Sequence, residues 1–157
     1  MVVRPWSWKS FVAGLCGTLA HSSLMYLKSS AGLLPAFQPY ESFQIALGHL
    51  IGAEVPLIVP WAISFVSGAT LVGFLFGRIY RWLPGRSGVG KGLAFGVMGW
   101  AAMGLLFFPW LGLGYFAGGI GLGIAPALLS LAMLLAYSLV MGIVYAALDR
   151  GSAQVRL

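Results

Sequence analysis

The sequence predicts an all-α integral membrane protein built as a bundle of four transmembrane helices. Of its 157 residues, 60% are hydrophobic and 8% are charged, whereas a soluble domain is about half apolar and about a quarter charged. The mean hydropathy is +0.94. Between short clusters of charge lie four apolar stretches with the roughly 20 residues that a spanning helix needs. We expect a single membrane domain, residues 1–157, with spans at about 10–30, 57–80, 92–112 and 124–147.

Basic residues gather at three places that four spans would bring to the same side of the membrane. They are Arg4 and Lys9 before the first span, Arg78, Arg81, Arg86 and Lys91 between the second and third, and Arg150 and Arg156 after the fourth. Short loops rich in lysine and arginine stay in the cytoplasm. The charge pattern therefore places both termini and the middle loop inside, and three or five spans would put a basic cluster outside.

The net charge of +6 is a signal of topology here and does not indicate nucleic-acid binding. The basic residues are spread along the chain, whereas a nucleic-acid-binding domain gathers them on one soluble face. Cys16 is the only cysteine, so no disulfide can form within the chain. It falls inside the first apolar stretch, where we expect it to act as a small packing residue.

Aromatic and basic residues near the inner ends of the first two spans predict anchors at the membrane surface. Indole rings prefer the lipid headgroup layer, and arginine side chains reach from there to water. The expected anchors are Trp6, Trp8, Arg78, Arg81 and Trp82.

The long outer connection between the first two spans contains a segment with helical periodicity at about 41–52. Its apolar residues fall on one side of a helix and its polar residues largely on the other. The apolar set is Phe43, Ala46, Leu47, Leu50 and Ile51, and the polar set is Glu41, Gln44 and His49. We expect a short amphipathic helix that lies on the outer leaflet.

Small residues recur at helical spacing in the first three spans and predict the faces where helices pack. Glycine and serine let two helix backbones approach closely in a membrane. The expected packing residues are Gly14, Gly17, Ser64, Gly68, Gly73, Gly77, Gly92, Gly96 and Gly99.

The connection between the last two spans, residues 112–123, has six glycines and no charge. A loop this apolar is unsuited to water. We expect it either at the outer interface or as a short re-entrant piece, since irregular backbone at membrane depth must be satisfied by protein or water.

The first and third spans align at an offset of 82 residues. Lys9, Gly14, Gly17, Ala20 and Leu24 correspond to Lys91, Gly96, Gly99, Ala102 and Leu106. This suggests a duplicated two-helix hairpin, a parallel repeat of the kind that some transporters contain. Chance alignment is the alternative, because glycine, alanine and leucine are abundant throughout the chain.

Several strings of the sequence together resemble a known family. They are G-x-x-G-T-x-x-x-x-S-L-M at residues 14–25, GLLP at 32–35, SFVSG at 64–68, LPGRS at 83–87 and K-G-L-x-F-G-V-x-G-W at 91–100. The chain resembles a bacterial family of small four-helix membrane proteins, domain of unknown function 6789, over about residues 10–148. The resemblance implies a four-helix fold in a bacterial inner membrane, and it implies no activity.

His21 is the one candidate for cofactor binding. It lies about twelve residues past Lys9, which at about 1.5 Å per residue places it roughly 18 Å into the membrane. An ionisable group at that depth is a functional hypothesis by default, and a neutral imidazole can ligate haem iron or the magnesium of a chlorophyll-type pigment, or relay protons. The alternative is a histidine hydrogen-bonded to a neighbouring helix through a serine such as Ser64 or Ser67. Because no second histidine lies at that depth, we favour this alternative and expect no cofactor.

No pattern in the sequence indicates an enzyme or a metal site. Glu41 and Glu54 flank the amphipathic segment, where we expect them to form its polar edge. The string GRSGVGK at 85–91 lacks the G-x-x-x-x-G-K-[ST] spacing of a phosphate-binding loop. We expect no catalytic residues and no metal ligands.

Three functional hypotheses remain open. The favoured one is a non-catalytic accessory or scaffolding subunit of a larger membrane complex, respiratory or photosynthetic, with the bilayer and other transmembrane subunits as partners and a bound lipid, quinone or pigment as a further partner. The second is a small oligomeric transporter or channel, although a path for polar solutes needs more polar groups in the membrane. The third is a haem- or pigment-binding protein that uses His21.

Overall fold

The computed structural model describes residues 5–154 and contains only helices and turns over that range. Four helical stretches are long and apolar enough to cross a membrane: Trp6–Ser30, Ile58–Ile79, Gly88–Trp110 and Ala125–Gly151. The prediction of an all-helical protein with four membrane-length helices is confirmed. Arg4 and Arg156, which contributed to the predicted orientation, lie outside the described residues.

Two of the four spans change their helical type along their length. The first span is α1 (Pro5–Ser30) and the fourth is α7 (Ala125–Gln154). The second consists of α3 (Ile58–Ser67), the π-helical turn η1 (Gly68–Val72) and α4 (Gly73–Ile79). The third consists of α5 (Gly88–Ala102), the π-helical turn η2 (Met103–Phe107) and α6 (Phe108–Trp110). Outside the spans lie α2 (Pro39–Ile51) and the 3₁₀ turn η3 (Tyr115–Ile120).

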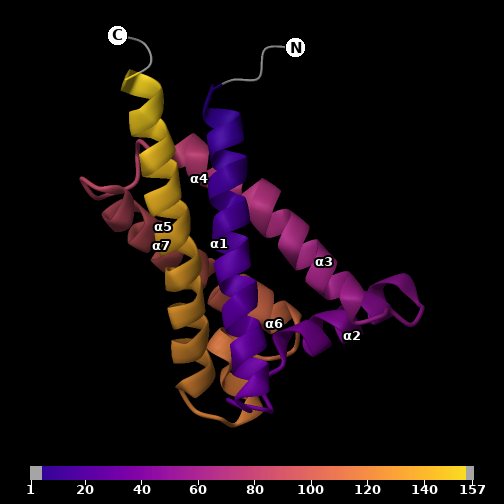
Figure 1. Ribbon diagram of the computed structural model, residues 1–157. Coiled ribbons are helices and arrows are strands. Elements are labelled where there is room, and N and C mark those ends of the chain that lie inside the picture. The colour runs from indigo at the N-terminus through magenta and orange to yellow at the C-terminus, as the bar shows by residue number, and fades with distance from the viewer. Residues whose placement is uncertain (1–4, 155–157) are drawn as a thin grey trace.

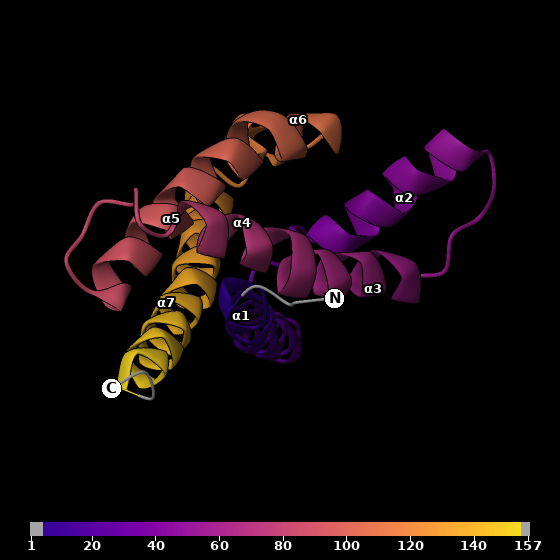
Figure 2. The ribbon, with the colours of Figure 1, turned by 90° about the horizontal axis from the view of Figure 1, so that it is seen from above.

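The helices are close together at one end of the molecule and spread apart at the other. α7 runs antiparallel to α1 and also packs against α5, while α4 packs against α1 (Figure 1). α3 then leans away from α1 and, outside its own span, packs against α2 (Figure 1). Seen from above, α2 lies between α3 and α6 (Figure 2). The start of α1 and the end of α7 share the closely packed end, where Lys9 Nζ lies 2.8 Å from a carboxylate oxygen of Asp149.

At the closely packed end, α5 and α7 approach so tightly that only glycine fits. A Cβ atom added to Gly92 would lie 2.3 Å from the carbonyl oxygen of Ser138. One added to Gly142 would lie 2.2 Å from the carbonyl oxygen of Gly88. The contact loosens along α5, because a Cβ at Gly99 would meet only a side-chain atom of Leu134, at 3.2 Å.

The contact between α1 and α4 follows the same pattern. A Cβ on Gly14 would lie 2.5 Å from the carbonyl oxygen of Ala69, and a Cβ on Gly73 would lie 2.7 Å from that of Ser10. The eight glycines expected to mediate packing all lie against a neighbouring helix in this way, at added-Cβ distances of 3.2 Å or less: Gly14, Gly17, Gly68, Gly73, Gly77, Gly92, Gly96 and Gly99. Ser64, the remaining expected packing residue, lies at the spread end and lines a pocket.

The amphipathic segment between the first two spans forms α2, which begins two residues before the expected range of 41–52 and ends one residue before its end. Proline stands at its start, and Gly52 ends it in the left-handed conformation, with φ of 69°. Phe43 and Leu47 are partly buried against the bundle. Leu50 and Ile51, from the same expected apolar face, are 73% and 63% exposed. Only the first two turns of α2 therefore pack on the protein.

We expect Gly92→Ala to lower the free energy of unfolding by about 2 kcal/mol, because the added methyl group would overlap backbone that cannot move without separating α5 from α7. Thermal unfolding in detergent measures the effect. Gly151→Ala, near the end of α7, is the matched control, because nothing lies within 4 Å of a Cβ atom added there. Equal melting curves for the two variants would contradict the tight glycine crossing.

Candidate functional site

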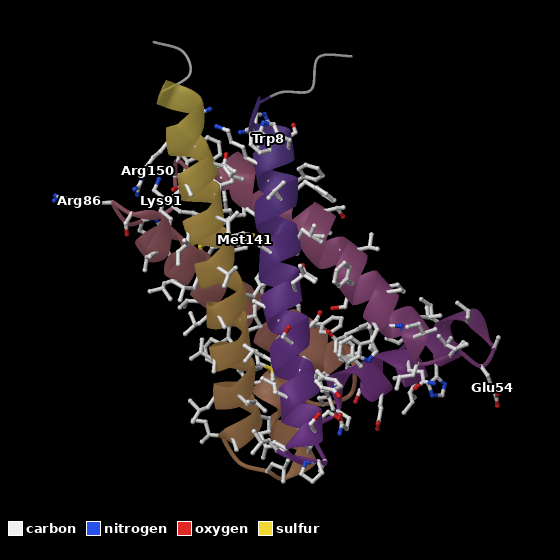
Figure 3. All side chains as sticks on the ribbon, in the orientation of Figure 1. Trp8, Glu54, Arg86, Lys91, Met141 and Arg150 are labelled. Atoms are coloured by element: carbon white, nitrogen blue, oxygen red, sulfur yellow. The ribbon has the colours of Figure 1, made fainter. Side chains whose placement is uncertain are left out.

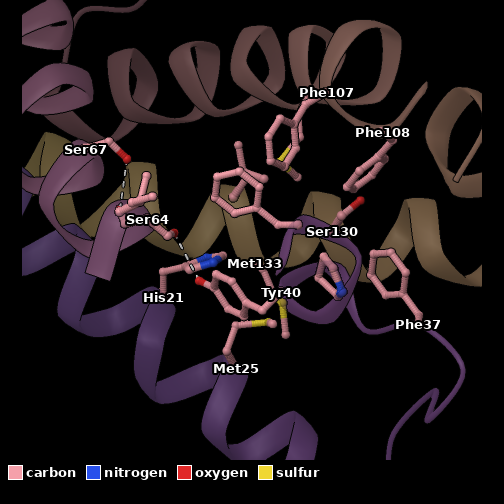
Figure 4. Close-up of a pocket in the computed structure, with 15 residues that line it drawn as sticks. His21, Met25, Phe37, Tyr40, Ser64, Ser67, Phe107, Phe108, Ser130 and Met133 are labelled. Carbon is pink, nitrogen blue, oxygen red and sulfur yellow. Dashed lines mark hydrogen bonds between the residues drawn. The ribbon is translucent and has the colours of Figure 1, made fainter. Parts of the chain in front are cut away.

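An apolar pocket of about 320 Å³ lies where the spans spread apart. Every membrane-length helix contributes to it, and α2 adds a further wall (Figure 4). Its lining is His21, Met25, Phe37, Pro39, Tyr40, Phe43, Ile63, Ser64, Ser67, Met103, Phe107, Phe108, Ser130, Met133 and Leu134. A small-molecule site typically has about 300–1,000 Å³, mostly apolar walls and a few polar groups that fix orientation, and this pocket has all three properties.

The polar groups of the pocket come from four different helices. Tyr40 Oη on α2 lies 3.1 Å from Ser64 Oγ on α3 (Figure 4). Ser67 donates to the carbonyl of Ser64 at 3.2 Å, and Ser130 on α7 donates to the carbonyl of Ala127 at 2.9 Å. The imidazole of His21 on α1 is partly buried. The backbone carbonyl of Met133 lies beside its ring.

α2 is held across the spread end by aromatic contacts on both sides. On one side, Tyr40 stacks on Trp61 of α3 with ring centroids 4.2 Å apart. On the other, Phe43 meets Phe107 of η2 at 5.5 Å and Trp110 of α6 at 6.0 Å. Burial raises the pKa of the Tyr40 phenol, so its hydroxyl keeps the proton with which it can donate. The helix thus joins two diverging spans and closes the pocket between them.

The pocket is also bounded by the two π-helical turns. Met103 and Phe107, the first and last residues of η2, line it, and Ser67 immediately precedes η1. A π-helical turn leaves the regular hydrogen-bond ladder and is often found at functional sites. Tyr137 on α7 donates its hydroxyl to the carbonyl of Gly68, the first residue of η1, at 2.8 Å. The carbonyl of Gly68 lies within a span, and the bilayer core has no water to hydrogen-bond it. The hydroxyl of Tyr137 therefore satisfies this carbonyl.

A buried lysine fixes the chain that leads into α2. Lys28 is only 2% exposed. Its ammonium donates to the carbonyl of Phe37 and lies 5.6 Å from the centre of that residue's ring. The side-chain oxygen of Gln38 is a longer contact at 3.5 Å. Since Phe37 lines the pocket and Pro39 begins α2, these contacts set where α2 starts.

The glycine-rich connection at residues 112–123 folds back onto the spread end. Phe116 occupies the notch at Gly104, where an added Cβ would lie 2.2 Å from its ring, and it packs on Trp100 with ring centroids 4.6 Å apart. Phe116 and Ala117 both have positive φ, 51° and 60°. Leu113 and Ala117 are buried in one cluster with Phe37 and Phe108. The loop therefore forms a packed cap beside the pocket.

The predicted surface anchors lie at the opposite end. Of these anchors, Trp8 lies with the basic residues Arg86 and Arg150 at the end where α1 begins and α7 ends, far from Glu54 (Figure 3). The guanidinium groups of Arg78 and Arg81 lie 5.4 and 5.6 Å from the ring of Trp82.

Tyr80 and Lys91 form part of the same end. Lys91 donates to the carbonyl of Tyr80 at 2.7 Å and lies 4.4 Å from the centre of its ring. Burial, and then the nearby Asp149 carboxylate, raise the pKa of Tyr80. Trp6, which was expected as an anchor, packs its ring edge against Phe74 of α4 at 6.3 Å.

The remaining titratable candidates do not gather at the pocket. Glu41, His49 and Glu54 are exposed on or after α2. Cys16 is a free thiol that is partly buried in α1. Within residues 5–154, no three side chains of histidine, cysteine, aspartate or glutamate come together as a metal site would require.

Comparison with known sequences gives a family and no activity. A model of the family of unknown function DUF6789 matches residues 6–155. The chain belongs to this family. The resemblance expected from the sequence strings is thereby confirmed over nearly the whole chain. No curated protein and no solved structure matches it significantly.

The sequence indicated His21 and, as its candidate serine partners, Ser64 and Ser67, and all three line the pocket. It did not indicate most of the other lining residues. Tyr40, Ser130 and Met133 gave no signal, because each is ordinary in its local sequence and gains meaning only when α2 and α7 meet. The one feature of the sequence that could have indicated the pocket is Phe43. It lies on the apolar face of a short helix next to membrane spans, and such a face indicates that the helix packs over an apolar surface.

We expect Tyr40→Ala to release α2 from α3, because the variant loses both the stack on Trp61 and the hydroxyl contact with Ser64. Amide hydrogen exchange over residues 39–51 should accelerate about tenfold, as the loss of about 1.4 kcal/mol of local stability implies. Tyr26→Ala, at a tyrosine that is 70% exposed, is the control. Unchanged exchange in α2 would show that the aromatic contacts do not hold it.

Proposed function

We propose that this protein binds a small apolar ligand with a polar head group in the pocket between its four spans and α2. The observation that carries the proposal is the closure of the pocket by α2, which contacts α3 through Tyr40 and the η2–α6 arm through Phe43. A helix that only lay on the membrane surface would not need both contacts. The protein acts by holding the ligand, and we propose no catalysis.

The composition of the pocket supports a neutral ligand that comes from the bilayer. Its lining has no acidic residue and no lysine or arginine, and burying an unpaired charge there would be costly. Ile63 lines the pocket and is also 42% exposed, so the pocket reaches the lipid-facing surface beside α3. The apolar walls favour a bound amphiphile over a polar solute in transit, which is what a channel would need.

The polar groups support binding without catalysis. A histidine that acts as a general base is usually oriented by a carboxylate or another fixed partner and placed beside a nucleophile. Here the hydroxyl hydrogens of Ser67 and Ser130 are directed at backbone carbonyls. The imidazole of His21 faces the carbonyl of Met133. None of these groups is arranged as an activated nucleophile.

We further propose that the protein lies in a bacterial inner membrane with both termini in the cytoplasm. The support is the gathering of basic residues at the end where α1 begins and α7 ends. Lys9, Arg78 and Arg81 lie there near Asp149, together with Lys91 and Arg150 (Figure 3). Cytoplasmic loops are rich in such residues. In this orientation the pocket and α2 belong to the outer half of the bilayer.

An accessory role in a larger membrane complex is the second candidate, and one surface favours it. At the corner formed by α2 and the start of α3, four large apolar side chains are each more than 60% exposed: Ile45, Leu50, Ile51 and Ile58. Another transmembrane subunit, respiratory or photosynthetic, would cover them. The ligand held in the pocket would then lie next to that subunit.

Purification from native membranes in mild detergent tests both candidates. We expect the wild-type protein to retain one stoichiometric small molecule, which extraction and mass spectrometry identify. Ser67→Phe should lose it, because the new ring fills the pocket. Ala62→Phe, at an exposed position of the same helix, should keep it.

The outcomes separate the candidates. Retention of the same mixture of bulk lipids by the wild type and by Ser67→Phe would contradict ligand binding. Stoichiometric copurification of other membrane subunits would establish the accessory role, and a partner-free protein would refute it.

A further inference from the structure

The hydrogen-bonding groups of the pocket limit the chemistry of the head group that it can hold. Each serine hydroxyl has one hydrogen and two lone pairs. Ser67 directs its hydrogen to the carbonyl of Ser64, and Ser130 directs its own to the carbonyl of Ala127. Both hydroxyls therefore present only acceptor lone pairs to a ligand.

The Tyr40–Ser64 pair supplies a single donor. The two hydroxyls have two hydrogens, and one of them is used in the 3.1 Å contact between the oxygens. The other is left for a ligand, whichever of the two residues donates to its neighbour. Among the hydroxyl groups that line the pocket, only this pair can donate a hydrogen bond to a ligand.

His21 supplies an acceptor to the same pocket. A neutral imidazole has one N–H and one bare nitrogen. Because a carbonyl oxygen only accepts, the ring nitrogen beside the carbonyl of Met133 carries the hydrogen, and the bare nitrogen can accept a hydrogen from a ligand in the pocket that His21 lines. Figure 4 shows His21 with Tyr40 and Ser64 in the lining of this pocket.

A hydroxyl group matches this arrangement, because it donates one hydrogen bond and accepts another. A carbonyl or an ether can accept from the Tyr40–Ser64 pair but leaves the imidazole nitrogen without a partner. A buried polar group without a partner weakens binding strongly. A carboxylate or phosphate would bring a charge that no side chain of the lining balances.

The walls of the pocket match an aromatic ring. Four phenylalanines line it: Phe37, Phe43, Phe107 and Phe108. Such rings pack well edge-to-face against another ring, and Phe37 and Phe108 already meet in this way at 5.8 Å. Three methionines also line the pocket: Met25, Met103 and Met133. Their polarizable sulfur atoms pack favourably against the edge of an aromatic ring.

We infer that the pocket binds the hydroxylated aromatic ring of a membrane amphiphile, a phenol or a quinol, with its hydroxyl between His21 and the Tyr40–Ser64 pair. The inference rests on the proposed function and names the ligand class of the same site. The apolar tail of the ligand leaves the pocket past Ile63 into the lipid.

Three probes with the same tail test the inference on the full-length protein in nanodiscs: dodecylphenol, dodecylanisole and dodecylbenzoate. The phenol donates and accepts, the anisole only accepts, and the benzoate is an anion. Isothermal titration should give an affinity for the phenol about tenfold higher than for the anisole, and no measurable binding of the benzoate.

His21→Leu should reduce the affinity for the phenol to that for the anisole and leave the affinity for the anisole unchanged. Retained binding of the anisole also shows that the variant is folded. Ser23→Ala is the control on the same helix, because its exposed hydroxyl bonds the carbonyl of Leu19 and should affect neither probe.

The results distinguish this inference from the proposal on which it rests. Failure of the phenol and the anisole alike to bind would overturn the proposed function. Equal binding of the two by the wild type, or loss of both in His21→Leu with an unchanged melting curve, would overturn the assignment of the head group and leave an apolar ligand site in place.

Discussion

The close crossing of α7 with α5, together with the similar close contact of α1 with α4, determines the shape of the molecule. Backbones that touch through Gly88, Gly92 and Gly142 leave no room for a side chain at that end. Straight helices that cross at one point must separate away from it. In a bilayer the resulting space is filled by lipid, water, a ligand or the chain itself, and its apolar lining favours an apolar occupant over water. Here α2 fills part of it, and the pocket is what remains.

The divergence also explains where regular helical structure is interrupted. Both π-helical turns, η1 and η2, lie where their spans leave the tightly packed region. Tyr137 compensates at η1 by donating to the carbonyl of Gly68. At the spread end, Lys28 donates to the carbonyl of Phe37 in the non-helical segment before α2. The capping loop covers that segment with buried apolar side chains. The irregular segments thus have partners within the protein, as the membrane environment requires, and they border the pocket.

The sequence predicted the four long helices, the position of α2 and the glycine contacts, because each depends on composition or on spacing within one helix. It did not predict the pocket. Ser64 was read as a packing residue, yet whether it faces a helix or a cavity depends on the direction in which α3 leaves α1. The sequence likewise does not predict the π-helical turns or the contact of Tyr40 with Ser64, because both depend on contacts between segments distant in sequence. For His21, the sequence predicted a serine such as Ser64 or Ser67 as its hydrogen-bond partner. Both serines line the pocket with it, but among the described residues their hydroxyls bond Tyr40 and a backbone carbonyl instead.

In the proposed function, the pocket holds a specific ligand and the exposed surface of the same span meets bulk lipid. Photo-crosslinking in native membranes tests it most directly, with p-benzoylphenylalanine placed at Phe107, which lines the pocket, or at its neighbour Leu106, which is 72% exposed. The account predicts an adduct of one defined mass at Phe107 and a mixture of phospholipid adducts at Leu106. The same phospholipid mixture at both positions would contradict it.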